Sequence, residues 1–223
     1  MLRILLWKIC FEWANLKRVL IPGPDRKICY LAFGANLSPQ VLRRRKIRIF
    51  DSTDHVLEDA GLRFSQKGFY RHHGYASADG IKGEKVYGKL YLILQSDALR
   101  MDYYEGVPFL GAHEKVYSTQ GNQAFFYYRA RRPLKQLKPT REYLDYLLNA
   151  YRTMPIVPAD YVRSLERTEV LEEYLADNST GVLVRDISSW PKILHPLLVS
   201  YERLGSRTIE SLWNRSLFQW MIR

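Results

Sequence analysis

The chain has 223 residues, of which 47% are hydrophobic, and it carries a formal net charge of +11 at pH 7. A chain of this length can bury one sizeable core with some length left for appendages, and its positive charge favours an anionic partner: nucleic acid, a membrane surface or a small anionic substrate. Its two cysteines, Cys10 and Cys29, are too few for a metal cluster or a disulfide framework. We therefore expect a protein of a reducing, cytoplasmic compartment.

Residues 1–21 form the first predicted element, an amphipathic helix that ends before Pro22. Its apolar residues recur at helical spacing: Leu2, Leu5, Leu6, Ile9, Trp13, Leu16 and Leu20. Lys8, Glu12 and Lys17 interrupt the apolar run, which excludes a membrane span and argues against a signal peptide. The helix either docks on the protein's own surface or lies in a membrane interface as a peripheral contact.

Residues 28–37 have the pattern of a β-strand that leads into a loop. β-Branched, aliphatic and aromatic residues fill positions 28–33, and Gly34 supplies a position where the backbone can take a positive φ or approach a ligand closely. Ser38 is a suitable N-cap, and Pro39 a suitable first residue, for a helix that follows. Such a turn directs several backbone N–H groups at one spot, which can hold a carboxylate, a phosphate or an oxyanion. A tight turn without any ligand has the same pattern.

A basic run at residues 43–48 follows this loop. Binding of nucleic acid would need interleaved aromatic residues or a known binding module around the run, and the sequence contains neither. We interpret the run as a solvated helix face and predict no nucleic-acid partner.

Residues 86–94 form the clearest later strand, and Ser96 or Asp97 can cap a short helix that runs from about residue 98 to 104. Glu105 would lie at the negative end of that helix dipole. Partial burial there would raise the pKa of its carboxyl, as a general base near neutral pH requires. An exposed glutamate at a helix end is the plainer alternative.

The later elements complete the chain. They are a hairpin of residues 113–118 and 123–130, a helix capped by Thr140, a helix that begins near Pro158, and helices within residues 171–223 that pack on the core or on the first helix. We divide the chain into an N-terminal helical extension (1–27), a central domain (28–170) and a C-terminal helical extension (171–223).

Three stretches carry a resemblance when they are taken together. They are the strand and turn from Tyr30 to Leu37, the strands between Tyr75 and Leu94, and Asp102-Tyr-Tyr-Glu-Gly-Val107. With the segment from Met154 to Tyr161, they resemble the γ-glutamylcyclotransferase-like family in residues, order and spacing. The match covers roughly residues 28–168, and the pairing of the glycine loop with the Glu-Gly motif makes it specific.

The resemblance implies an α+β fold, a mixed β-barrel with flanking helices. It also implies an enzyme that cyclises the γ-glutamyl part of a small γ-glutamyl peptide or amine to 5-oxoproline and releases the rest, without a metal or cofactor. By that likeness Glu105 is the acid/base, while the turn backbone holds the glutamyl end and tyrosines line the pocket. The implied substrate-binding residues are Tyr30, Phe33, Gly34, Ala35, Asn36, Leu37, Tyr128 and Tyr143.

The sequence departs from the family pattern at two places. Phe33 and Ala35 stand where tyrosine and serine are usual, which removes two hydroxyl groups. The segment 111–113, which ends in His113, stands where the family often has aromatic hydroxyls. A second hypothesis keeps the fold without catalysis: a binding or scaffold protein whose terminal helices contact a membrane or a partner.

Overall fold

A computed structural model describes residues 2–20, 25–68, 72–108 and 110–171. Its elements, in chain order, are α1 (Leu2–Leu20), β1 (Lys27–Ala32), the 3-10 turn η1 (Ala35–Leu37), α2 (Pro39–Arg44), β2 (Asp51–Lys67), β3 (Gly74–Leu94), α3 (Gln95–Tyr104), β4 (His113–Gln120), β5 (Gln123–Ala130), α4 (Arg141–Arg152) and α5 (Ala159–Glu166). The helices expected in residues 172–223 lie outside the described residues.

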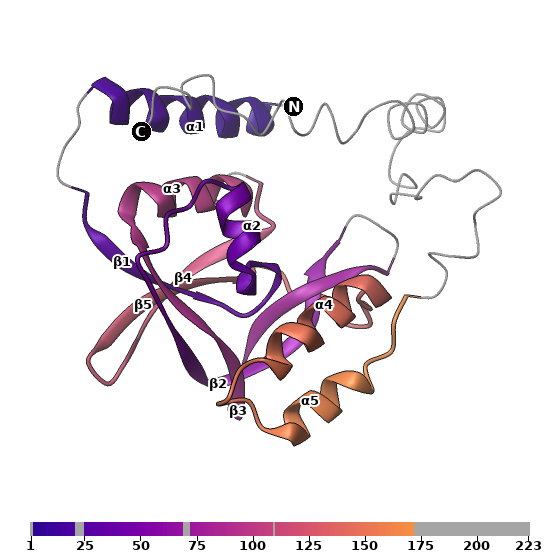
Figure 1. The fold of residues 1–223 in the computed structure, drawn as a ribbon. Coiled ribbons are helices and arrows are strands. Elements are labelled where there is room, and N and C mark those ends of the chain that lie inside the picture. The colour runs from indigo at the N-terminus through magenta and orange to yellow at the C-terminus, as the bar shows by residue number, and fades with distance from the viewer. Residues whose placement is uncertain (1, 21–24, 69–71, 109, 172–223) are drawn as a thin grey trace, which may run out of the picture.

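The five strands form one mixed sheet in the order β2-β3-β1-β5-β4. β1 pairs in parallel with β5, where Tyr30 lies opposite Phe126, and the other neighbouring strands are antiparallel. The α+β fold with a mixed sheet and flanking helices is therefore confirmed. Within the described residues the edge strands β2 and β4 form no ladder with each other, so the sheet is open and strongly curved rather than a closed barrel (Figure 1).

Local signals in the sequence agree with several element boundaries. Ser38 caps α2, because its side chain accepts a hydrogen bond from the N–H of Gln40, and Pro39 is the first residue of that helix. Thr140 caps α4 in the same way. One cap was predicted wrongly: α3 begins at Gln95, directly after β3, and no side chain caps it.

The sheet buries side chains on both faces. One cluster lies between the sheet and α4 and α5, and it includes Leu31, Phe33, Val86, Leu144, Leu147 and Tyr151. The other lies between the sheet and α2 and α3, and it includes Tyr30, Ala32, Tyr91, Ile93, Met101 and Phe126. The central strand β1 supplies both clusters because successive side chains of a strand point to opposite faces, so the loop that follows β1 starts from a fixed position.

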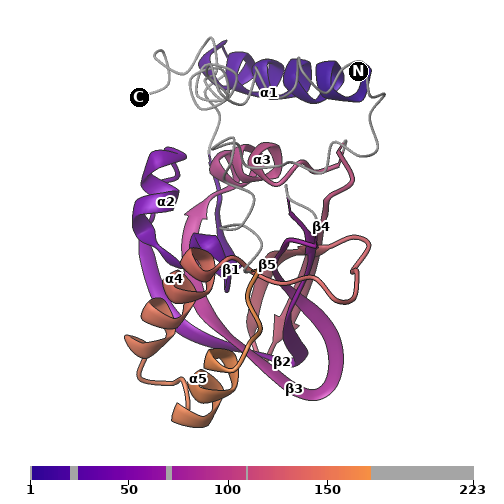
Figure 2. The ribbon, with the colours of Figure 1, turned by 90° about the vertical axis from the view of Figure 1, so that its right-hand side faces the viewer.

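Helix α1 packs on α3 (Figures 1 and 2). Trp7 stacks on Tyr103 and donates a hydrogen bond from its indole nitrogen to the Tyr103 carbonyl oxygen at 2.9 Å, and Phe11 stacks on the same ring. The face of α1 that points away from α3 is also apolar and is exposed: Leu6, Ile9, Trp13 and Leu20. No helix in the described part of the chain is long and apolar enough to cross a membrane.

Candidate functional site

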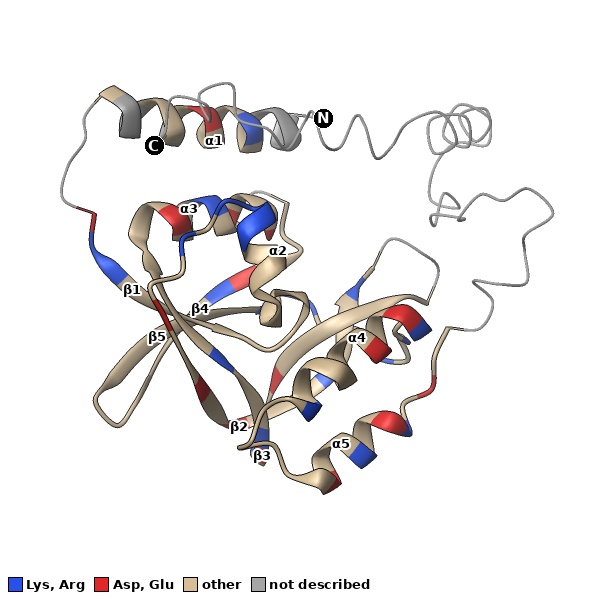
Figure 3. Cartoon of the chain, viewed as in Figure 1, with Lys and Arg blue, Asp and Glu red and all other residues tan. Residues whose placement is uncertain are grey.

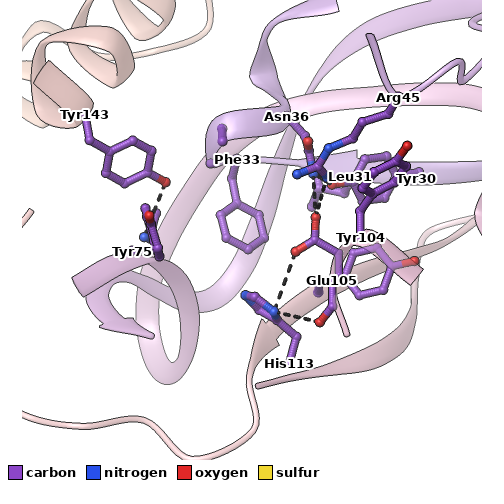
Figure 4. A pocket seen from close by; sticks show the side chains of 14 residues that line it. Tyr30, Leu31, Phe33, Asn36, Arg45, Tyr75, Tyr104, Glu105, His113 and Tyr143 are labelled. Atoms are coloured by element: carbon purple, nitrogen blue, oxygen red, sulfur yellow. Dashed lines mark hydrogen bonds and ion pairs between the residues drawn. The ribbon is translucent and has the colours of Figure 1, made fainter. Parts of the chain in front are cut away.

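A cavity of about 340 Å³ opens between the loop after β1, the end of α3, the start of β4 and helix α4 (Figure 4). Its lining consists of Tyr30, Leu31, Phe33, Gly34, Ala35, Asn36, Arg45, Tyr75, Ala76, Tyr104, Glu105, His113, Tyr128 and Tyr143. All but one of the residues that the family resemblance implied are among them. The exception is Leu37, whose side chain is buried in the core.

Tyrosine hydroxyls hold the backbone of the loop after β1 through its carbonyl groups. Tyr151 donates to the carbonyl oxygen of Phe33 at 2.7 Å, and Tyr146 donates to that of Ala35 at 2.6 Å. Among the described residues, the N–H groups of residues 34–36 have no hydrogen-bond acceptor. The loop is thus held through its carbonyl oxygens, and the three N–H groups of residues 34–36 are left to bind a ligand.

Gly34 plays a steric role rather than the conformational role that its turn position suggested. The sequence left two roles open for Gly34, a positive φ or a close approach to a ligand, and its φ of −114° excludes the first. A Cβ at this position would lie 3.2 Å from the Tyr143 hydroxyl oxygen and 3.7 Å from the Ala76 Cβ. Glycine therefore lets the loop approach α4 closely across the cavity.

Glu105 is the residue directly after α3, and its carboxylate lies inside the cavity with 13% of the side chain exposed. Its Oε1 accepts a hydrogen bond from Arg45 Nη1 at 2.7 Å and another from Asn36 Nδ2 at 3.2 Å. The next residue, Gly106, has a φ of +68°, a conformation that favours glycine and ends the helix. The exposed alternative for Glu105 is therefore wrong.

The pKa of the Glu105 carboxyl is shifted in the opposite direction from the sequence prediction. Burial alone would raise the pKa of the carboxyl, but the charge of Arg45, with smaller contributions from His113 and Asn36, outweighs burial and holds the pKa below its ordinary value. The prediction of a raised pKa is therefore wrong, because it counted the helix dipole and burial but not a cation supplied by another part of the chain.

Arg45 is the site residue that the sequence interpretation missed. It follows α2 immediately and forms the ion pair with Glu105. Its guanidinium carbon Cζ lies over the ring of Tyr104, 4.9 Å from the ring centroid. Figure 3 shows basic residues on α2. The interpretation of the basic run as a solvated helix face is therefore wrong for this arginine. The sequence indicates where the helix begins, but it does not indicate which side of the helix faces α3.

His113, the first residue of β4, contacts Glu105 twice. Its Nδ1 lies 3.0 Å from the Glu105 carbonyl oxygen and 3.6 Å from carboxylate Oε2. Because a carbonyl oxygen can only accept, Nδ1 carries the proton in this contact. In Figure 4 the other edge of the imidazole points away from Glu105, toward Tyr75 and Phe33.

Three tyrosines of the resemblance line the cavity from different elements. The Tyr30 hydroxyl accepts a hydrogen bond from Asn36 at 2.8 Å, Tyr128 donates to Asp102 at 2.5 Å, and Tyr143 accepts from the N–H of Ala76 at 3.4 Å. Burial raises the pKa of all three phenols, so they are neutral at physiological pH. The cavity is therefore rich in neutral hydroxyls and aromatic surface around one ion pair.

Among the described residues, no group of three or more histidine, cysteine, aspartate or glutamate side chains is arranged to hold a metal ion. The described cavity contains one carboxylate, one guanidinium and one imidazole at a single end. This set can pair with an ammonium group and move a proton.

Comparisons with known proteins bear on the fold. No protein-family model matches the chain, and no curated protein matches it. A solved structure named gamma-glutamyl cyclotransferase is 20% identical, with a TM-score of 0.54, and the match covers 73% of this chain and 96% of that one. The uncharacterized protein loc79017 from Homo sapiens is also 20% identical (TM-score 0.53; 66% of this chain and 90% of that one).

A third structure, YkqA from Bacillus subtilis, is 17% identical, with a TM-score of 0.52 and coverage of 70% of this chain and 58% of that one. Similarity at 17–20% identity shows a shared fold and does not show a shared substrate or mechanism. The chain therefore has the γ-glutamyl cyclotransferase fold.

Proposed function

We propose that the chain is a γ-glutamyl cyclotransferase, which converts the γ-glutamyl part of a small peptide or amine to 5-oxoproline and releases the amino acid or amine. The observation that supports this most strongly is the position of Glu105. Its ionised carboxylate lies in the cavity, hydrogen-bonded to Asn36 of the same loop whose N–H groups are free to bind a ligand.

The loop after β1 would hold the glutamyl end of the substrate. The N–H groups of Gly34, Ala35 and Asn36 are donors for a carboxylate or for the oxygen that becomes negative when the γ-carbonyl is attacked. Because tyrosines on α4 fix this loop through its carbonyl oxygens, the donors are in place before the substrate arrives.

Glu105 would serve as the acid/base. A carboxylate held ionised by Arg45 attracts the substrate's α-ammonium group and keeps the amine near the γ-carbonyl. Ring closure is intramolecular, so holding the folded conformer supplies much of the rate enhancement. The remaining task is to take a proton from the attacking nitrogen and return one to the leaving nitrogen.

The far side of the cavity would receive the leaving group. Phe33, Tyr75 and Tyr143 present aromatic surface there, and the usual family hydroxyl is absent at position 33. This favours leaving groups with apolar or amphipathic stems, and it supports γ-glutamyl amines as well as γ-glutamyl amino acids.

The proposal is tested by incubating the purified chain with a panel of γ-glutamyl amino acids, dipeptides and amines and measuring 5-oxoproline. We expect turnover of at least one compound, and a loss of about 10²- to 10⁴-fold in Glu105→Gln. Glu58→Gln is the matched control, because Glu58 is half exposed on β2 and pairs with Lys85 outside the cavity. Absence of 5-oxoproline with every compound, or an unchanged rate in Glu105→Gln, would contradict the proposal.

A second candidate function, contact with an anionic membrane surface through α1, is favoured by the exposed apolar face of that helix. Ile9, Trp13 and Leu20 are 51%, 66% and 67% exposed, on the side opposite the face that packs on α3. Residues 1–27 also carry six basic and two acidic residues, which favours anionic lipid.

Vesicle co-sedimentation tests this candidate. We expect binding to vesicles that contain phosphatidylserine, weaker binding to pure phosphatidylcholine, and loss of binding in Trp13→Glu. Leu134→Glu, an equally apolar exposed site away from α1, is the control and should bind as the unaltered chain does. Equal sedimentation of both variants would exclude α1 as the contact.

A further inference from the structure

Helix α1 packs on the last turn of α3, and Glu105 follows that turn directly. Trp7 and Phe11 of α1 stack on the ring of Tyr103, at centroid distances of 4.2 Å and 3.8 Å. Tyr103 is 3% exposed and lies in the last turn, shortly before Glu105. The N-terminal helix is therefore in contact with the element that carries the proposed acid/base (Figures 1 and 2).

The backbone at the end of α3 is also tied to α1. Carbonyl groups in the last turn of a helix have no partner within the helix itself. The Tyr103 carbonyl oxygen accepts a hydrogen bond from the Trp7 indole nitrogen at 2.9 Å and another from the N–H of Gly106 at 3.1 Å. One oxygen thus joins α1 to the backbone on both sides of Glu105, so a displacement of α1 shifts the segment from which the carboxylate extends.

Side-chain contacts lead from the same tyrosine to the ion pair of the cavity. The ring of Tyr103 meets the ring of Tyr104 edge-on, at a centroid distance of 5.6 Å. Arg45 lies over the Tyr104 ring and donates from Nη1 to Glu105 Oε1 at 2.7 Å. Figure 4 shows Arg45, Tyr104 and Glu105 together at one end of the cavity. Because packed side chains leave few voids between them, a shift of Tyr103 is passed on to the guanidinium and the carboxylate.

We propose that α1 is a positioning element of the site: Trp7 and Phe11 act through Tyr103 to hold the carboxylate that follows α3 against the loop after β1. The inference rests on the proposed cyclotransferase function and deepens it, because it gives the N-terminal helix a part in the reaction. Trp7 and Phe11 do not line the cavity, so they are positioning residues. Ring closure depends on the orientation of the reacting groups, so a small displacement of the acid/base lowers kcat.

The two faces of α1 differ, and the difference supplies a control. Trp7 and Phe11 lie on the face toward Tyr103, whereas Trp13 lies on the other face and is 66% exposed. A surface that binds the exposed face leaves the contacts with Tyr103 in place, so the positioning role does not depend on membrane contact. Trp13 is the same residue type in the same helix, and it therefore matches Trp7 in everything except the contact with α3.

The test uses the full chain and a substrate that the 5-oxoproline assay has identified. We expect Trp7→Ala to lower kcat by at least about fivefold, because the acid/base is displaced from the reacting groups. KM should change less than about twofold, since the N–H groups that hold the glutamyl end belong to the loop after β1. Trp13→Ala, the matched control, should keep the original kcat and KM.

The pKa of the Glu105 carboxyl gives a readout that needs no turnover. Arg45, His113 and the buried tyrosines of the cavity are the charged and titratable groups that face this carboxyl, and of these Arg45 packs on Tyr104. If α1 holds the ion pair together, Trp7→Ala should raise the pKa of Glu105 toward its ordinary value. NMR titration of the chain with ¹³C-labelled glutamate measures it, and Glu105→Gln assigns the signal.

Phe11→Ala is the second variant, because it removes the other ring from Tyr103 and keeps the indole hydrogen bond. We expect the same direction of change in kcat and in the pKa of Glu105, and far-UV circular dichroism shows that each variant is folded. A kcat within fivefold of the original and an unchanged pKa in both variants would overturn the inference while the cyclotransferase function stood. Absence of 5-oxoproline with the unaltered chain would instead remove the proposed function itself.

Discussion

Helix α3 has an acid at each end, Asp97 buried and Glu105 partly buried, and the two acids have different surroundings. Asp97, in the first turn, has a side chain that is 1% exposed; it accepts a hydrogen bond from the backbone N–H of Arg48 at 3.0 Å and lies 3.9 Å from Arg100 of its own helix. Glu105, after the last turn, is paired with Arg45 from another element and lines the cavity.

The helix dipole acts on these two acids in opposite directions. It stabilises a negative charge at the N-terminal end, where Asp97 lies, and opposes one at the C-terminal end, where Glu105 lies. Asp97 therefore links α3 to the segment before β2 from a position where the helix dipole stabilises its negative charge. Glu105 is held in an unfavourable position by an arginine, and such placement is typical of a carboxylate kept for chemistry rather than for stability.

The largest expected effect is a difference in unfolding free energy between variants of the two acids. We expect Asp97→Asn to lower the free energy of unfolding by about 2–4 kcal/mol, because it removes a fully buried charge from its hydrogen-bond and ion-pair partners. Glu105→Gln should cost less than half as much. Urea unfolding of both variants measures the difference, and equal losses would mean that Glu105 is as structural as Asp97.

The arginine partners of the two acids should separate in the opposite sense, with the larger loss on the Glu105 side. Arg45→Gln leaves the Glu105 charge without its closest cation, and we expect a loss of about 1–2 kcal/mol in unfolding free energy. The pKa of the carboxyl should also rise, which moves the acid limb of the pH–rate profile to higher pH. Arg48→Gln removes a side chain that is 46% exposed and 3.6 Å from Asp97, so its loss should stay below about 0.5 kcal/mol. Similar losses would show that the exposure of the arginine side chain does not decide the strength of these pairs.

The smallest effect concerns pH. The pKa of Glu105 is lower in the folded chain than its ordinary value, so its contribution to stability is fully present above the unfolded pKa of about 4.3 and is lost as the pH falls through the folded pKa. We expect the difference in unfolding free energy between the unaltered chain and Glu105→Gln to shrink between pH 6 and pH 3.5. A difference that grew on acidification would mean that the folded pKa is raised.

Local features of this protein could be predicted from its sequence. The strand and the helix between residue 28 and residue 44 follow from β-branched and aromatic residues, Ser38 and Pro39, whose effects act within a few residues. The β4–β5 hairpin follows in the same way from Gly121, whose φ of +57° suits a tight turn. Steric and hydrogen-bond preferences that act over a few residues depend on the local sequence alone, so the sequence by itself determined these elements.

The charge state of the site was decided by tertiary structure. Arg45 and Glu105 are 60 positions apart, and they meet because the end of α2 is folded against the end of α3. His113 reaches the same carboxylate only because β4 begins beside it. A pKa depends on every charge within several ångströms, whichever part of the chain supplies it. The sequence therefore identified Glu105, and only the folded chain could set the sign of its pKa shift and bring Arg45 and His113 to its side.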